Sequence, residues 1–570
     1  MSTVRAPWLK SYGDVPATLN YPEGTMKDAL ESAAWQYPDY TAYEFMGKRT
    51  SYEEAMQEIG ACARALRAIG IRENDRVTIC LPNCPQAVTM FYAVNMVGAV
   101  ANMVHPLSSE GEIRFYLEDS GSVAAITLDQ FHDKFQSARK GTKLKHLIIA
   151  SVKDALSPVM KLGYAVTQGR KIPSVPKDAD ALLWKDFLKR GHAFKGDPTV
   201  RRAAKDPAVI LYSGGTTGTT KGILLTNLNF NALGAQLVSS NKCFTSGVIM
   251  LSIMPMFHGF GLGVGVHTML INGAQCILVP RFTPDSIAGL IKKYRPNFMA
   301  GVPTLYEAIL RSPASRDLDM SCFKGIFSGG DSLSVELKKR FDKFLREHNG
   351  TIEIREGYGT TECVTASCVT PEFSSREGSI GIPLPDMYYK VVRVGTEDEL
   401  PYGEEGEICL AGPTVMVEYV NQPKETADTL KRHADGMTWV HTGDLGFMDE
   451  DGFLYFRQRI KRMIVTSGYN VYPSQVENIL DANEYVHMSC VIGVPDPLKV
   501  QKVKAFVMLK PGVIPSDKVR NEIYEYCTKH IARYAMPYDI EFRQILPKTL
   551  VGKVAYRELE QEELQKTVSM

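Results

Sequence analysis

The residues most suited to chemistry lie in one polar loop, Tyr212–Gly222, which reads Tyr-Ser-Gly-Gly-Thr-Thr-Gly-Thr-Thr-Lys-Gly. The loop follows a predicted strand at Ala208–Tyr212 and precedes a predicted helix at Thr226–Val238. Its glycines let backbone N–H groups turn toward an anion, its hydroxyls are further donors, and Lys221 supplies a positive charge. The pattern predicts a polyphosphate site formed by Ser213, Gly214, Gly215, Thr216, Thr217, Gly218 and Lys221.

This segment is not a Walker A loop, which ends in Gly-Lys-Ser or Gly-Lys-Thr. Here two threonines separate Gly218 from Lys221, and Gly222 follows the lysine. A P-loop nucleotidase is therefore disfavoured. The alternative is a flexible surface loop without function. It is the weaker interpretation, because eight consecutive Gly, Ser or Thr residues after a buried strand would destabilise the fold without a compensating role.

Six further motifs follow the loop along the chain. They are Pro255-Met256-Phe257-His258, Ser328-Gly329-Gly330-Asp331, Tyr358-Gly359-Thr360-Thr361-Glu362, Thr442-Gly443-Asp444, Arg459-Ile460-Lys461 and Gly552-Lys553. With these motifs in this order, the chain resembles the adenylate-forming superfamily of acyl-CoA synthetases, luciferases and peptide-synthetase adenylation domains. Its sequence pattern is most similar to that of the bacterial long-chain fatty-acid–CoA ligases.

The resemblance implies a two-step reaction that uses ATP, CoA and Mg²⁺. A carboxylate first attacks the α-phosphate of ATP to form an acyl-adenylate and release pyrophosphate, because a free carboxylate is a poor acylating agent. The thiol of CoA then displaces AMP. Charge that develops on phosphorus requires fixed donors and cations. The resemblance assigns these roles to Thr361 as a donor, Glu362 as the Mg²⁺ ligand and Lys221 as a cation.

The resemblance also implies the nucleotide contacts. Asp444 is expected to accept hydrogen bonds from both ribose hydroxyls, with Arg459 as a second ribose contact. Tyr358 offers an aromatic face to the adenine. The other expected nucleotide-binding residues are Gly329, Gly330, Asp331, Gly359 and Thr360.

Lys553 is expected to bridge the incoming carboxylate and the α-phosphate in the first step. A single lysine near a C-terminus is usually only a solvated charge, and its place in the ordered series is what favours the functional interpretation. The resemblance further implies that the C-terminal domain then rotates about a hinge at Lys461. After rotation Ser467, Gly468 and Tyr469 would guide CoA. The alternative interpretation of Gly468 is a glycine that serves only a turn.

The acyl pocket is expected at His258, Gly263 and Val302. The run Gly259–Gly265 has glycine at alternate positions, so on a helix one side would lack bulk and leave room for an apolar chain. A histidine such as His258 is as often structural, and methionines are as often core filler as groove lining. The methionines considered are Met254, Met256, Met269 and Met299. We expect a medium- to long-chain fatty acid, with an aryl or other bulky acid as the alternative.

Three other functions share parts of this pattern. A stand-alone adenylation enzyme that loads a carrier-protein pantetheine would have nearly all these residues, and it stays open as an alternative. A luciferase-type oxygenase is disfavoured by Val465, where that activity has a second lysine. A non-enzymatic nucleotide-binding regulator would have lost Lys553 or Glu362, and both are present.

The elements that must position these residues alternate, from about residue 75, between short apolar runs and longer amphipathic stretches. The alternation predicts an α/β fold of parallel strands with crossover helices, in which ligands bind at the carboxyl ends of strands. The predicted strands are Arg76–Pro82, Ala124–Leu128, His146–Ala150, Ala208–Tyr212, Val248–Ile253, Gln275–Val279, Phe298–Val302 and Gly325–Phe327. The clearest helices are Gln86–Val97 and Val335–His348.

The sequence pattern changes after about Ser379, and this change predicts the domain organisation. Short alternating segments predict a small β-rich subdomain at about 380–457. The basic run that begins at Arg459 predicts a connector. We therefore expect an N-terminal adenylation domain at 1–458, with two doubly wound sheets and the β-rich subdomain. A mobile, small α+β C-terminal domain is expected at 459–570.

Composition limits the partners and the location. The 570-residue chain has 65 basic and 64 acidic side chains, and a formal charge of +1 argues against a nucleic-acid partner. The eleven cysteines lack the paired spacing of a zinc site and predict reduced thiols in a cytoplasmic protein. We identify neither a signal-peptide run at the N-terminus nor an uninterrupted apolar span. Residues 151–176 interleave apolar and basic side chains, which favours either a surface hairpin or a peripheral membrane contact.

Overall fold

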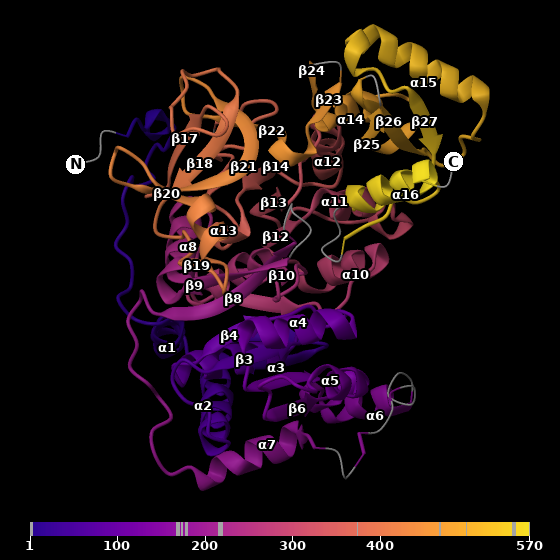
Figure 1. Cartoon of the computed structure of the whole chain (residues 1–570). Coiled ribbons are helices and arrows are strands. Elements are labelled where there is room, and N and C mark those ends of the chain that lie inside the picture. The colour runs from indigo at the N-terminus through magenta and orange to yellow at the C-terminus, as the bar shows by residue number, and fades with distance from the viewer. Residues whose placement is uncertain are drawn as a thin grey trace.

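The computed structural model describes residues 4–166, 172, 175–176, 180–214, 220–372, 374–466, 469–496, 499–549 and 554–568. In these ranges the strands form four sheets. Two large sheets build the body, and the last sheet belongs to the C-terminal elements, which lie at the upper right of the view (Figure 1). The α/β class predicted from the sequence is confirmed. No helix in the described ranges is long and apolar enough to cross a bilayer.

The first sheet has eight strands in the order β19-β9-β8-β4-β3-β5-β6-β7. Its central strands are parallel, and they are short runs of Val, Ile, Leu and Ala that are buried on both faces. The strands are β3 (Arg76–Cys80), β4 (Val100–Met103), β5 (Ala124–Leu128), β6 (His146–Ala150), β7 (Leu182–Leu183), β8 (Pro207–Gly214), β9 (Thr220–Thr226) and β19 (Glu418–Tyr419).

The second sheet has nine strands in the order β16-β15-β14-β13-β12-β10-β11-β1-β2. Strands β14 to β1 in this order run parallel, and antiparallel strands cover both edges. The strands are β1 (Thr41–Phe45), β2 (Lys48–Ser51), β10 (Ile249–Ser252), β11 (Gln275–Leu278), β12 (Phe298–Gly301), β13 (Gly325–Gly329), β14 (Ile354–Tyr358), β15 (Cys368–Val369) and β16 (Ile382–Pro383).

The helix predicted at Thr226–Val238 is present, but the sequence analysis missed the strand β9 that lies between the polar loop and this helix. β8 and β9 pair as an antiparallel hairpin in which Ser213 lies opposite Lys221. A strand forms here because the apolar run Ile223–Leu225 is buried in the sheet. Helix α8 (Asn227–Ser239) begins only after β9. The described residues on both sides of the loop therefore belong to strands, and β9 separates the loop from the N-terminus of α8.

The third sheet is entirely antiparallel, as expected for the β-rich subdomain. Its strands are β17 (Tyr388–Val392), β18 (Gly406–Ala411), β20 (Leu430–Arg432), β21 (Thr438–Met448) and β22 (Leu454–Arg459). The fourth, C-terminal sheet contains β23 (Ile464–Thr466), β24 (Tyr469–Val471), β25 (Val486–Asp496), β26 (Val500–Leu509) and β27 (Asp539–Phe542). Its helices are α14 (Pro473–Asp481), α15 (Asp517–His530) and α16 (Tyr556–Val568).

The hydrophobic core is shared by the two large sheets, and α3 (Pro85–Met96) lies in it with nearly every residue buried. The buried clusters of the fourth sheet contain only residues beyond 463, so the C-terminal unit has a core of its own. The other α-helices are α1 (Met26–Gln36), α2 (Tyr52–Ala68), α4 (Glu110–Ser120), α5 (His132–Ala138), α6 (Pro158–Val166), α7 (Trp184–Arg190), α9 (Thr268–Leu270), α10 (Pro284–Tyr294), α11 (Pro303–Arg311), α12 (Val335–Glu347) and α13 (Pro423–Thr429).

Candidate active site

A large cavity lies between the second sheet, α8 and the π-helix η6 (Phe260–His267). It contains about 1020 Å³ of space not filled by protein atoms, part of it open to solvent. Its polar end lies at the carboxyl ends of β13 and β14, where the sequence places the nucleotide. The predicted residues that line it are His258, Gly329, Gly330, Tyr358, Gly359, Thr360, Thr361 and Arg459. Asp331 is exposed and stands outside this lining.

At the polar end two neighbours hold the buried carboxylate of Asp444. The Tyr358 hydroxyl donates to Asp444 Oδ2 at 2.5 Å, and Arg459 Nε lies 2.9 Å from Oδ1. The pairing of β21 with β22 places Asp444 directly opposite Arg459. Burial, together with the Asp444 charge, raises the pKa of Tyr358, so the phenol stays protonated as a donor. A ribose that binds Asp444 must therefore displace or share these two partners.

The turn after β13 has a partner that the sequence did not reveal. Glu356 Oε1 accepts a hydrogen bond from the Leu333 backbone N–H at 3.1 Å, which ties the turn to β14. Burial raises the pKa of Glu356 to about 8, so this carboxyl is mostly neutral at pH 7. A Cβ at Gly329 would lie 3.0 Å from the Gly357 carbonyl oxygen. Glycine thus lets the turn lie close against β14.

On the phosphate side, Tyr419 connects two of the predicted catalytic residues, Glu362 and Lys221. Its hydroxyl donates to Glu362 Oε1 at 2.6 Å, and Lys221 Nζ lies 4.5 Å from the centre of its ring. Lys221 also forms an ion pair with Glu425 in α13, and the hydrogen bond from Lys221 lowers the pKa of Glu425. Pairing of β19 with β9 brings Tyr419 here. Sequence reasoning missed Tyr419 and Glu425 because no local pattern marks partners about two hundred positions apart.

Backbone strain lies directly after Glu362. Thr361 and Glu362 belong to the short 3₁₀ turn η8 (Thr361–Cys363), and Val364 follows with φ 68° and ψ −59°. The Thr365 N–H donates to the Cys363 carbonyl oxygen at 2.8 Å, which closes a γ-turn of the rare, strained kind. A β-branched residue takes this conformation only where its surroundings hold it. The segment that carries Thr361 and Glu362 is therefore held in one backbone geometry.

Two glycines of the η6 region, Gly259 and Gly263, pack against this turn, and with Gly261 they lack the free space that the sequence predicts beside them. A Cβ at Gly259 would lie 1.8 Å from the Val364 carbonyl oxygen, and one at Gly263 would lie 3.0 Å from Val364 Cγ1. A Cβ at Gly261 would lie 2.1 Å from another backbone carbonyl oxygen. These glycines allow close packing of the chain against itself, and the acyl chain gains no room from them.

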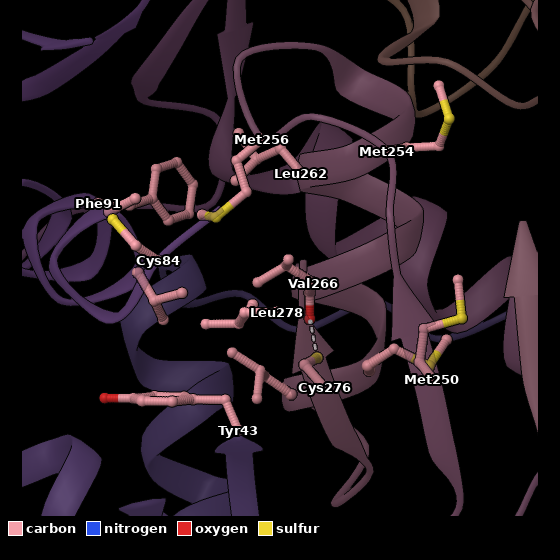
Figure 2. Close-up of a cluster of buried hydrophobic side chains, with 14 of the residues drawn as sticks. Tyr43, Cys84, Phe91, Met250, Met254, Met256, Leu262, Val266, Cys276 and Leu278 are labelled. Atoms are coloured by element: carbon pink, nitrogen blue, oxygen red, sulfur yellow. Dashed lines mark hydrogen bonds between the residues drawn. The ribbon is translucent and has the colours of Figure 1, made fainter. Parts of the chain in front are cut away.

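The apolar end of the cavity has a lining that differs from the predicted one. His258 lines it, whereas Gly263 and Val302 do not. Of the four methionines, only Met269 belongs to the lining, and Figure 2 shows Met254 and Met256 among the buried side chains of the core. The apolar lining residues are Leu237, Val238, Phe244, Met250, Phe260, Val264, Met269, Phe298, Ala300, Phe327 and Val369.

Several predicted residues fall outside the part of the chain that the structure describes. They are Gly215, Thr216, Thr217, Gly218, Ser467, Gly468 and Lys553. The backbone of Gly214 ends β8, and that of Tyr469 pairs with Thr466 between β24 and β23. Lys461 is exposed in the 3₁₀ turn η9 (Ile460–Arg462), which joins the third sheet to the C-terminal sheet.

Comparisons with known proteins agree with this arrangement. Residues 30–420 match the family described as AMP-binding enzyme, and residues 475–553 match the AMP-binding enzyme C-terminal domain. The chain is 35% identical, over 98% of both chains, to a long-chain-fatty-acid–CoA ligase of Bacillus subtilis strain 168. ATP-bound MatB from Rhodopseudomonas palustris superposes with a TM-score of 0.81 at 25% identity, over 95% of this chain and 99% of that one. The anthranilate CoA ligase AuaEII with anthranoyl-AMP has the same fold, with a TM-score of 0.83 at 24% identity over 98% and 99% of the chains.

Proposed function

Because this chain belongs to the family of AMP-binding enzymes, we propose that it is an ATP-dependent acid–CoA ligase. The observation that carries the proposal is the single cavity, which joins a polar end beside Tyr358, Asp444 and Arg459 to an apolar end between α8 and the second sheet. A nucleotide and an organic acid can meet in such a cavity with the carboxylate next to the α-phosphate. His258 and Thr361 line it between the two ends.

In the first step a carboxylate oxygen attacks the α-phosphorus of ATP, the bond to pyrophosphate breaks, and an acyl-adenylate forms. In this proposal Thr361 donates to the α-phosphate, Lys221 and the loop 213–218 hold the outer phosphates, and Lys553 bridges carboxylate and phosphate. The strained turn after Glu362 supports these roles. It holds the donors in advance of the reaction, which is the arrangement that stabilises developing charge most strongly.

Mg²⁺ enters this proposal as part of the MgATP substrate. Among the described residues no cluster of three or more His, Cys, Asp or Glu side chains suits a metal ion. Glu362 is the proposed protein ligand, and its carboxylate fits a hard ion that keeps several waters and binds phosphate oxygens. The bound ion would neutralise phosphate charge. Tyr419 orients Glu362 through its hydrogen bond to Oε1.

In the second step the CoA sulfur attacks the acyl carbonyl carbon and AMP leaves. We place the domain boundary between 458 and 459, the β-rich subdomain at about 380–457 and the hinge at Lys461. Two observations support a moving C-terminal unit of residues 459–570: its buried clusters are its own, and Lys461 lies in an exposed turn between the two sheets. Ser467, Gly468 and Tyr469 are the proposed CoA contacts. A carrier-protein pantetheine is the alternative thiol.

The proposed acid is of medium to long chain length. The cavity walls are Leu, Val, Met and Phe side chains, and each buried CH₂ group contributes about 0.8 kcal/mol to binding. The similarity to the Bacillus subtilis ligase supports the same choice. An aryl or other bulky acid is the second candidate, because an anthranilate ligase shares the fold.

We further propose a cytoplasmic enzyme that touches membranes through residues 151–176. In that stretch α6 exposes Val159 by 82% and Leu162 by 71%, and Lys153 and Lys161 supply positive charge beside them. Replacing Val159 and Leu162 by Ser should lower sedimentation with anionic liposomes. Equal sedimentation of variant and wild type contradicts the contact.

The test of the main proposal is acid-dependent pyrophosphate release, measured with and without CoA over a panel of fatty, aryl and bile acids. Release that depends on the acid, with AMP and an acyl-CoA formed in equal amounts when CoA is added, is the expected result. If acyl groups pass only to a carrier-protein pantetheine, the alternative thiol is correct. Absence of AMP with every acid contradicts the ligase.

A further inference from the structure

A buried arginine, Arg355, stands behind one wall of the cavity, in contact with lining residues but not itself one of them. Along the second sheet Ala300 lies opposite Phe327, and Phe327 lies opposite Arg355 on the next strand. Ala300 and Phe327 line the cavity, and so does Gly357, two positions after Arg355 on β14. Side chains two apart on a strand project to the same face. Arg355 therefore stands on the face that forms the cavity wall, at the end remote from the nucleotide.

Asn241, just after α8, is the lining residue that meets Arg355. Arg355 Nη1 donates to Asn241 Oδ1 at 2.8 Å, and the guanidinium lies 5.0 Å from the centre of the Phe327 ring. Asn241 Nδ2 donates one hydrogen bond, to the Leu237 carbonyl oxygen at 2.8 Å. An amide nitrogen carries two N–H groups. Within the described part of the chain the second N–H of Asn241 therefore has no acceptor.

The guanidinium of Arg355 has unused capacity as well. Its Nε donates to the Thr370 carbonyl oxygen at 2.8 Å, which braces β14 against the chain after β15. Its Nη2 is buried and has no hydrogen-bond partner among the residues that the structure describes. Burial lowers the pKa of Arg355 to about 10 despite the attraction of Glu372. Because Arg355 does not line the cavity, a molecule bound there meets the guanidinium through its charge and through Asn241, which Arg355 holds in place.

We propose that Asn241, positioned by Arg355, forms a polar subsite for a hydrogen-bond-accepting oxygen at the far end of the acyl group. The inference rests on the proposed function and narrows it to carboxylic acids whose chain ends in a carbonyl, hydroxyl or carboxylate oxygen. The unused N–H of Asn241 is a donor, so an acceptor fits and a methyl group leaves it unsatisfied. A carboxylate is attracted in addition by the positive charge of Arg355 behind Asn241. The carbons between the two ends contact the apolar walls.

The span from the subsite to the reacting end sets the range of chain lengths to test. Arg355 and Tyr358 mark the two ends of the wall on β14, three residues and therefore about 10 Å apart. Straight-chain acids from hexanoic to hexadecanoic, each ending in a methyl, a hydroxyl, a ketone or a second carboxylate, cover this span. Pyrophosphate release from the full chain gives kcat/KM for each acid.

For the wild type we expect that, at the chain length that fits, an oxygen-ended acid exceeds its methyl-ended partner about tenfold in kcat/KM, because the methyl-ended acid leaves a desolvated amide donor unpaired. Comparison of hydroxyl, ketone and carboxylate ends shows which acceptor the subsite takes. If methyl-ended acids are the better substrates at every length, the proposal is wrong.

Variants locate the preference. Asn241→Leu should lower kcat/KM for the oxygen-ended acid about tenfold and change the methyl-ended acid less than about threefold. Arg355→Lys keeps the charge but loses the planar fork, and should lower the same preference. Asn272→Leu is the matched control, because Asn272 Nδ2 also donates to a carbonyl four residues earlier, at 2.8 Å, but does not line the cavity. Thermal unfolding of each variant reports on folding.

The outcomes distinguish the subsite proposal from the proposed ligase function on which it rests. If Asn241→Leu lowers kcat/KM equally for the oxygen-ended and the methyl-ended acid, as a loss of support for the end of α8 would, Asn241 is structural and the subsite proposal is wrong. If AMP forms only with methyl-ended acids, the subsite proposal is wrong and the proposed ligase function stands. If AMP forms with none of the acids, the proposed function is wrong, and the subsite proposal fails with it.

Discussion

Replacement of Gly259 by alanine tests whether the glycines around η6 hold the strained turn or open an acyl pocket. Gly259 has helical φ and ψ of −53° and −34°, so alanine fits its backbone. The conflict is purely steric, because the new Cβ would lie 1.8 Å from the Val364 carbonyl oxygen. The turn that must yield comes directly after Thr361 and Glu362.

The size of the effect follows from these distances. Nonbonded heavy atoms meet at about 3.5–4.0 Å, so roughly 2 Å of movement is needed. Overpacking that moves only side chains costs about 1–3 kcal/mol. Here the obstacle is backbone, and we expect Gly259→Ala to lose about 3 kcal/mol or more of unfolding free energy. A Cβ at Gly265 would meet its nearest atom at 3.8 Å, an ordinary contact. Gly265→Ala should therefore be neutral, or more stable by up to about 1 kcal/mol.

Urea unfolding and pyrophosphate release with acids of graded chain length measure both consequences. For Gly259→Ala we expect lower stability and an equal fractional loss of rate at every chain length, because the shifted turn displaces Thr361 and Glu362. Gly265→Ala is the matched control from the same helix. The reasoning is refuted if Gly259→Ala keeps its stability and instead shifts the preference toward shorter acids, which is what a glycine-lined acyl pocket would do.

Three further changes test other parts of the site. Lys553→Ala should abolish adenylate formation while leaving transfer from supplied acyl-adenylate to CoA largely intact, as half-reaction assays measure; equal loss of both half-reactions contradicts alternating roles of the C-terminal domain. Glu425→Gln removes the carboxylate that pairs with Lys221 and should lower the KM for ATP a few-fold, a small effect because the pair is partly exposed; a higher KM would show that Glu425 positions Lys221. Glu356 has a folded pKa raised from 4.5 to about 8, so the folded protein binds more protons than the unfolded chain between these values, and stability falls as pH rises through them. Glu356→Gln removes this pH dependence, so the free energy of unfolding of the variant, measured with urea, should rise relative to that of the wild type between about pH 5 and 8. A difference that stays constant over this range contradicts the raised pKa.

Much of the fold could be predicted because its signals are local. The strands predicted at Ala124–Leu128 and His146–Ala150 are β5 and β6 residue for residue. Apolar runs bounded by turn residues have few other conformations open to them. The run Ile223–Leu225 carries the same kind of signal for β9, but it is short and follows directly on the polar loop, and the sequence analysis assigned no strand there.

The sequence by itself also determined the class of chemistry, through the types and order of residues along the chain. The reaction on an acid is implied by the resemblance of the ordered motifs, among them those around Glu362 and Asp444, to a known family. The polyphosphate site at the loop with Lys221 is predicted from what each of its groups can donate. That capacity belongs to the residue and not to its neighbours in space.

Only the tertiary structure decided which residues stand beside these groups. Glu425 beside Lys221, Tyr419 beside Glu362, and Val364 against Gly259 join segments from different strands and helices. The same holds for the contact of Arg355 with Asn241, a residue that lines the cavity. Such contacts arise from strand register and from close packing across the core, and both depend on the whole chain at once.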